Sequence, residues 1–105
     1  MAASNLAYAD DRQLDREEVH FRARATGPGG RPLRFLVVNI SPHGLMTRCE
    51  EAVAAGDLVR VQLPVVGTIF GEVRWALGGR AGVQFERMID LAPYYALLSA
   101  VVKGR

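Results

Sequence analysis

Two groups of polar residues have the types and spacing needed to bind an anionic ligand that carries a base. Arg12 and Arg16 form the first, an R-x-x-x-R pattern near the start of the chain. Positions i and i+4 lie on one side of a helix and of a strand, so both guanidinium groups can converge on one ligand. Each can hold a phosphate through two hydrogen bonds or stack on a purine. A chain with 12 arginines contains about one such pattern by chance, so this pair alone is a weak signal.

The second group follows after 22 intervening residues and reads N-x-S-x-x-G, from Asn39 through Ser41 to Gly44. Asn39 supplies an amide and a carbonyl and Ser41 a hydroxyl, the mixture of donors and acceptors that a guanine edge requires. Gly44 can take a positive φ and lets the backbone approach a base closely. With either Asp or Asn allowed at the first position, chance accounts for only ~0.02 occurrences of [DN]-x-S-x-x-G in a chain of this composition.

The second group lies at a turn between predicted strands. Residues 19–25 alternate, with Val19, Phe21, Ala23 and Ala25 on one side and His20, Arg22 and Arg24 on the other. The cluster Gly27-Pro28-Gly29-Gly30 then predicts a hairpin loop before a second strand over 33–40. Pro42 cannot donate to a β-ladder, so residues 41–44 are predicted to form a turn, followed by a short strand over 45–48.

Three further strands are predicted over 59–63, 68–76 and 81–86. The alanine-rich stretch 50–57 is expected to be a loop or one helical turn. In the longest strand, Val73 and Trp75 are expected to share one face. Six short strands predict a closed or nearly closed antiparallel barrel, because one sheet would leave two exposed edges and a bare face.

The last segment changes to helical spacing. Asp90 can cap a helix that carries Pro93 in its first turn, and the apolar positions recur at Leu91, Tyr95, Leu98 and Val102. Residues 1–10 show no periodicity and are predicted to form an N-terminal tail, and residues 11–105 a single domain. The predicted fold is therefore mainly β, a six-stranded antiparallel barrel, split or closed, with a C-terminal helix.

The composition excludes several classes of protein. A chain of 105 residues with a net charge of +2 has room for one core, which excludes multidomain enzymes. No stretch is long and apolar enough for a membrane-spanning helix, and the first residues lack the pattern of a signal peptide, so a cytoplasmic location is expected. The single cysteine, Cys49, excludes an internal disulfide and every cysteine-based zinc cluster.

Together these motifs resemble the PilZ domains, bacterial receptors for the second messenger cyclic di-GMP. The signature of that family is R-x-x-x-R followed some 20 to 30 residues later by [DN]-x-S-x-x-G. The resemblance extends over nearly the whole chain, through Gly71-x-Val73-x-Trp75, Gly82-Val83-x-Phe85 and the terminal helix.

The resemblance implies a binding module and not an enzyme. Arg12 and Arg16 would hold phosphate and guanine from the segment before the barrel, and Asn39, Ser41 and Gly44 would surround a guanine from the barrel surface. The ligand would be cyclic di-GMP, with no cofactor and no metal. Binding would change the surface offered to a protein partner in trans, and the chain would be a monomer or weak dimer that does not bind nucleic acid or insert into a membrane.

Acidic neighbours favour an alternative. Five carboxylates, those of Asp10, Asp11, Asp15, Glu17 and Glu18, compete for the two guanidinium groups and repel a dianionic ligand. Asn39 in place of Asp also gives up one charge-assisted acceptor. The alternative function is a PilZ-like protein-interaction adaptor that binds no nucleotide.

Simpler interpretations remain for individual residues. Arg12 and Arg16 can belong to a solvated, salt-bridged charge run, and residues 39–44 can form a plain turn. Ser41 with His43 could act as nucleophile and base, and His20, His43 and Cys49 could bind a metal, but no orienting acid and no ligand spacing supports either. Trp75 and either Tyr94 or Tyr95 are expected to be packing residues and not a stacking platform for nucleic acid.

Overall fold

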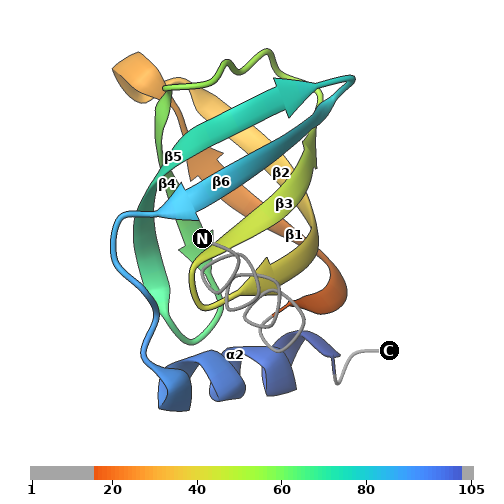
Figure 1. Cartoon of the computed structure of the whole chain (residues 1–105), viewed down its shortest axis with the longest axis vertical. Coiled ribbons are helices and arrows are strands. Elements are labelled where there is room, and N and C mark those ends of the chain that lie inside the picture. The colour runs from red at the N-terminus through yellow and green to blue at the C-terminus, as the bar shows by residue number, and fades with distance from the viewer. Residues whose placement is uncertain (1–15, 103–105) are drawn as a thin grey trace, which may run out of the picture.

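The computed structural model describes residues 16–102 and shows a closed six-stranded barrel with one helix across its end (Figure 1). Neighbouring strands are antiparallel, in the order β1-β2-β3-β6-β5-β4. The elements are β1 (Glu17–Thr26), the 3₁₀ turn η1 (Pro28–Gly30), β2 (Pro32–Ser41), β3 (Gly44–Cys49), β4 (Leu58–Leu63), β5 (Gly67–Leu77), β6 (Arg80–Phe85) and α2 (Leu91–Val102). The predicted fold class and all six strands are confirmed. Arg12 and the predicted tail over 1–10 lie outside the described residues.

Alternating apolar residues fill the barrel. The predicted inward residues of β1 and β4 are buried or half-buried, and the residues between them are exposed. Phe35, Leu33 and Ile40 of β2 are among the largest fully buried side chains. Residues 50–57 form a loop without a helical turn. The single core therefore follows from the period-2 pattern.

Three register shifts interrupt the described ladders, one between β1 and β2 at residues 18–21, and the bulges in β2 and β5 reverse the alternation. Val38 is an extra residue in β2 opposite β3, and Arg74 is an extra residue in β5 opposite β6. Because one inserted residue moves the following side chains to the other face, Trp75 does not share the inward face of Val73. Trp75 instead lies on the outer face, 40% exposed, so the sequence-based prediction for its face is wrong.

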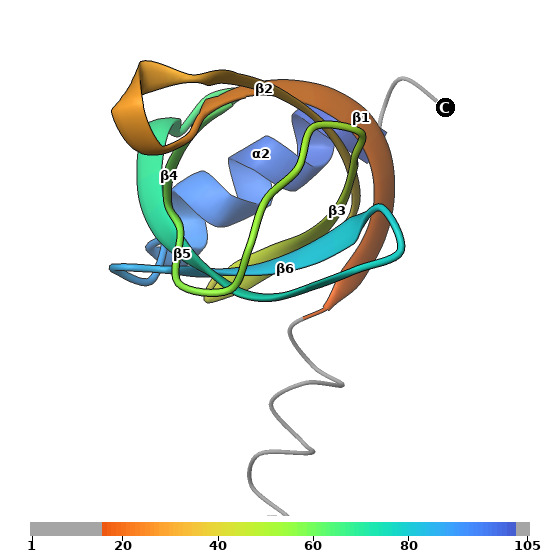
Figure 2. The same ribbon diagram turned by 90° about the horizontal axis from the view of Figure 1, so that it is seen from above.

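Helix α2 closes one end of the barrel. Viewed from above, it lies across the far opening (Figure 2). Tyr94 and Leu97 are buried against the core, and Leu98 and Val101 pack at its border. Tyr94 is a packing residue as expected, whereas Tyr95 is exposed. None of the described helices is long and apolar enough to cross a membrane.

Candidate functional site

The N-x-S-x-x-G motif forms a tight turn between β2 and β3, as predicted. Ser41 pairs with Gly44, and Pro42 and His43 make the turn. The hydroxyl oxygen of Ser41 accepts a hydrogen bond from the backbone N–H of His43 at 3.1 Å. The serine therefore stabilises its own turn, the role that the simpler interpretation assigns to it.

The bulge at Val38 decides where the motif side chains point. Leu33, Phe35 and Val37 are buried at alternate positions, so unbroken alternation would direct Asn39 into the core. After the bulge the buried position is Ile40, and Asn39 and Ser41 lie half-buried on the outer face. The irregularity in β2 thus makes both polar side chains available to a ligand.

Gly44 is required for strand packing. Gly44 does not have a positive φ, so that part of the sequence-based expectation is wrong. A Cβ at this position would instead collide with the backbone carbonyl of Val83 on β6. The absent side chain lets β3 and β6 approach each other.

Three hydrogen bonds hold the motif turn from the inside. The backbone N–H of Phe85 donates a hydrogen bond to the carbonyl oxygen of His43 at 2.8 Å. The backbone N–H of Ile89 donates one to the carbonyl oxygen of Pro42, which is buried, at 2.9 Å. The hydroxyl of Tyr94 donates to the carbonyl of Ile40 at 3.2 Å. The end of β6, the loop that follows it and helix α2 therefore all fix the position of this turn.

Arg16 is the described residue of the R-x-x-x-R pair. It is exposed and immediately precedes β1, in which Glu17 pairs with Ile40. Ile40 lies between Asn39 and Ser41 of the motif. The strand pairing therefore brings the residue next to Arg16 into contact with the motif strand, although the two patterns are separated by 22 residues in the sequence.

A cross-strand row extends this outer face around the barrel. The paired residues are, in order, Glu18, Asn39, Met46, Gly82 and Trp75. The amide of Asn39 donates to the thioether sulfur of Met46 at 3.8 Å. A Cβ on Gly82 would collide with the Trp75 indole, so the ring lies over this glycine.

The sequence interpretation missed Met46 and Trp75 as neighbours of the motif, because a bulge in each of two strands sets this row. Glu18 pairs with Asn39 on the neighbouring strand and places a carboxylate directly beside it. The acidic residues of the sequence indicated that carboxylates would lie near the site, but not that Glu18 would be the one beside Asn39.

The enzymatic and metal interpretations gain no support from the described residues. Ser41 bonds the backbone of His43, and this contact does not activate the hydroxyl as an imidazole would. His20 and His43 are exposed and Cys49 is buried. Within residues 16–102 no three His, Cys, Asp or Glu side chains gather as a metal site would require.

The strongest pKa shifts lie at the opposite end of β3. Burial raises the pKa of the Cys49 thiol to about 11, and a hydrogen bond to Glu51 adds to this effect. The pKa of Glu51 is lowered to about 2, because its carboxylate accepts hydrogen bonds from the backbone N–H and the guanidinium of Arg34. These groups fasten the loop after β3 to β2 and take no part in the motif turn.

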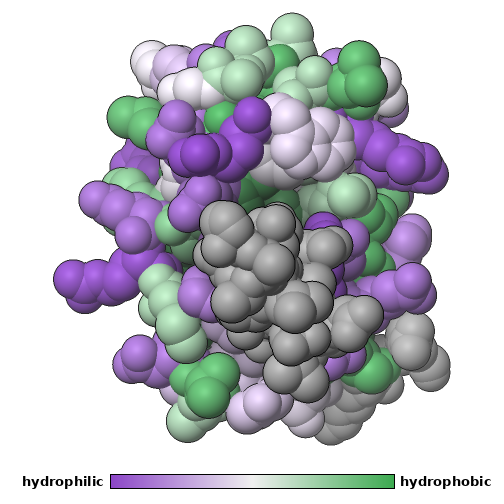
Figure 3. All heavy atoms as spheres, viewed as in Figure 1, coloured by the Kyte–Doolittle hydropathy of each residue, from purple (hydrophilic) through white to green (hydrophobic). Residues whose placement is uncertain are grey.

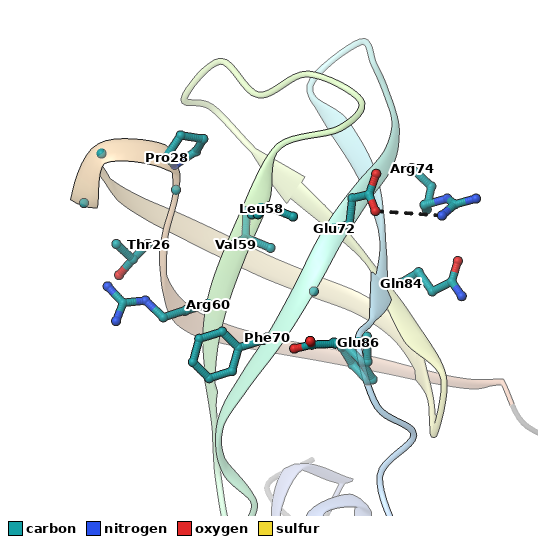
Figure 4. A pocket seen from close by; sticks show the side chains of 15 residues that line it. Thr26, Pro28, Leu58, Val59, Arg60, Phe70, Glu72, Arg74, Gln84 and Glu86 are labelled. Atoms are coloured by element: carbon teal, nitrogen blue, oxygen red, sulfur yellow. Dashed lines mark ion pairs between the residues drawn. The ribbon is translucent and has the colours of Figure 1, made fainter.

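A groove of about 670 Å³ lies across the outer face of β4, β5 and β6 beside η1 (Figure 4). Its charged lining is balanced, with Arg60 and Arg74 against Glu72 and Glu86, and Glu72 lies 4.0 Å from Arg74. The described motif residues do not line it. Gln84, which pairs with Gly44, is its connection to the motif face.

Comparisons with known proteins agree with this architecture. The family model described as "PilZ domain" matches residues 10–102. The crystal structure of the PilZ domain of CeSA from a cellulose-synthesizing bacterium is similar in fold, with a TM-score of 0.58 and 11% sequence identity. The similarity covers 84% of this chain and 95% of that one. No curated protein matches the chain. Because the family match spans most of the sequence and the barrel with its terminal helix is shared, the chain belongs to the PilZ domain family.

Proposed function

We propose that this chain is a receptor for cyclic di-GMP that signals to a partner protein in trans. PilZ domains are generally receptor domains for this dinucleotide, and they act by binding, not by catalysis. The observation that carries the proposal is the position of Asn39 and Ser41. The bulge at Val38 turns both onto the outer face, and Glu17, the residue next to Arg16, pairs with Ile40 between them.

In this proposal each group has a separate task. The amide of Asn39 and the hydroxyl of Ser41 bond the edge of a guanine, while Gly44, which has no side chain, lets the base approach the backbone. Arg12 and Arg16 pair with the phosphates and stack on a guanine. The ligand bridges the barrel and the segment before it, so binding fixes that segment against the barrel.

Hydrogen bonds connect this turn to the C-terminal helix and to the loop before it, so ligand binding at the turn can affect both. Ile40 and Pro42 belong to the motif turn, and their carbonyls accept hydrogen bonds from Tyr94 and Ile89. A shift of the turn on binding therefore acts on α2 and on the loop that leads to it. A partner that recognises this end of the barrel would distinguish the two states.

Calorimetry with cyclic di-GMP tests the proposal. The unaltered chain should bind with micromolar or tighter affinity, and the double variant Arg12→Ala, Arg16→Ala should lose this binding. The matched control is Arg22→Ala, Arg24→Ala, which removes the same charge from exposed positions of β1 away from the turn. This control should retain most of the affinity.

Two results would overturn the receptor function. Absence of heat from the unaltered, folded chain would leave the adaptor that binds no nucleotide. Equal binding by both double variants would place the ligand elsewhere. Asn39→Ala and Ser41→Ala, tested singly, should each weaken binding, since each removes one polar group from the base pocket.

A further inference from the structure

Helix α2 contains no charged residue, although 23% of the chain is charged. Its twelve residues are LAPYYALLSAVV. The side of α2 that closes the barrel carries Tyr94, Leu97 and Val101. A surface helix of a monomer normally presents charged or polar groups on its opposite side, and a helix that is apolar all round is buried all round.

A second apolar stripe, formed by Leu91, Tyr95, Leu98 and Val102, runs along α2 beside the buried side, and Leu98 lies between the two. Leu91 is 49% exposed, Tyr95 61% and Val102 37%, and Leu98 lies at the border with the core. Hydrophobic side chains reach the surface at the lower edge of Figure 3, where Figure 1 places α2. The intervals of four, three and four residues are those of the seam between two packed helices.

The exposed ring of Tyr95 contacts a buried ring. The Tyr95 ring lies 5.6 Å from that of Tyr94, centroid to centroid, at an interplanar angle of 57°. Tyr94 is itself buried and anchored to the carbonyl of Ile40. An aromatic side chain that is already positioned loses little conformational freedom on association and serves well as the centre of an interface.

The stripe is complementary to itself. Its spacing reads the same from either end, so in an antiparallel pair Leu91 meets Val102 of a second copy and Tyr95 meets Leu98. No like charges meet along this seam. The charges of the sequence flank it with opposite signs, Asp90 before the helix and Lys103 and Arg105 after it. Antiparallel packing therefore also brings opposite helix ends together.

We propose that the chain forms a symmetric homodimer in which α2 of one copy packs antiparallel against α2 of a second copy. The helix is about 18 Å long, so the seam buries less than the roughly 800 Å² per partner that is typical of stable interfaces. The dimer is accordingly weak and forms only at high protein concentration.

Sedimentation equilibrium over about 5 to 500 µM tests the dimer. The unaltered chain should pass from 11.5 kDa at low concentration towards twice that mass. Tyr95→Glu should remain monomeric at every concentration, and Val102→Glu gives an independent second variant at the end of the stripe. Phe70→Glu is the control, because Phe70 is an exposed apolar residue of β5 outside α2 and its replacement should leave the dimer intact.

A monomer at the highest concentration would overturn the proposal, as would dimerisation of folded Tyr95→Glu equal to that of the unaltered chain. Orientation is tested by mixing Leu91→Cys with Val102→Cys under oxidising conditions. The antiparallel pair predicts a disulfide mainly between the two different variants, and self-linking of Leu91→Cys alone would contradict it. Buried Cys49 stays in both variants, since its thiol is shielded.

Discussion

Glu18 is the residue that most directly opposes an anionic ligand at the motif turn. It is exposed and is the cross-strand partner of Asn39. We expect Glu18→Gln to tighten binding of cyclic di-GMP about fivefold at low salt, because one carboxylate no longer repels the phosphates. Calorimetry at low and high ionic strength measures the effect, which should shrink as salt screens the charge.

Glu50→Gln is the matched control for this prediction. Glu50 is exposed and follows β3 at the end remote from Gly44, so its removal should leave the affinity unchanged. Equal gains from both variants would indicate a general charge effect and would contradict a ligand beside Asn39.

The motif residues could be identified from the sequence, but only part of their physical roles could be predicted from it. Gly44 was expected to serve the turn or the ligand, and the structure shows that it also serves the contact with Val83. That contact joins strands that are distant in the sequence, and the position of a glycine does not reveal which neighbour requires it. Whether Asn39, Ser41 and Arg16 bind the ligand stays a prediction.

At the scale of the element, the hydroxyl of Tyr94 links helix α2 to the motif turn. Tyr94→Phe removes the hydrogen bond to the carbonyl of Ile40 and should lower the free energy of unfolding by about 1 to 2 kcal/mol. Tyr95→Phe is the matched control and should change it little, since that ring is mostly exposed. Urea unfolding followed by circular dichroism measures both variants, and equal losses would contradict a specific role of the Tyr94 hydroxyl.

The strands themselves could be predicted because alternation is a local property, but the bulges could not. Val38 and Arg74 have no residue type that marks an insertion, and the bulge exists only in relation to the facing strand. The error for Trp75 follows from this, since its face depends on one unpaired residue before it. The same limitation hid the outward direction of Asn39.

At the scale of the whole molecule, the free energy of unfolding should depend on pH because the carboxyl group of Glu51 has a lowered pKa. Its pKa is about 2 in the folded chain against roughly 4.3 for a free glutamate. The lowered pKa contributes stability that is fully present above about pH 4.3 and is lost as the pH falls to about 2. Glu51→Gln should therefore have a lower free energy of unfolding than the unaltered chain at pH 6. This difference should shrink progressively below pH 4.3.

Urea titrations from pH 2 to pH 6 check this dependence, with Glu50→Gln as the control at the neighbouring position. The difference between Glu51→Gln and the unaltered chain should shrink as the pH falls. A difference that stays constant with pH would mean that the contact with Arg34 does not discriminate between the two charge states of the carboxyl group.

The six strands form a closed barrel, but the number of paired residues differs between neighbouring strands. Between β1 and β4 only two residue pairs are formed, Ala25 with Val61 and Thr26 with Arg60, whereas β1 and β2 share eight. Native-state fluctuations should therefore separate β1 from β4 before any other pair of strands. The amides that cross this seam should exchange with deuterium fastest among the strand amides, and such an opening leaves β1 hinged on β2, the strand that carries the motif.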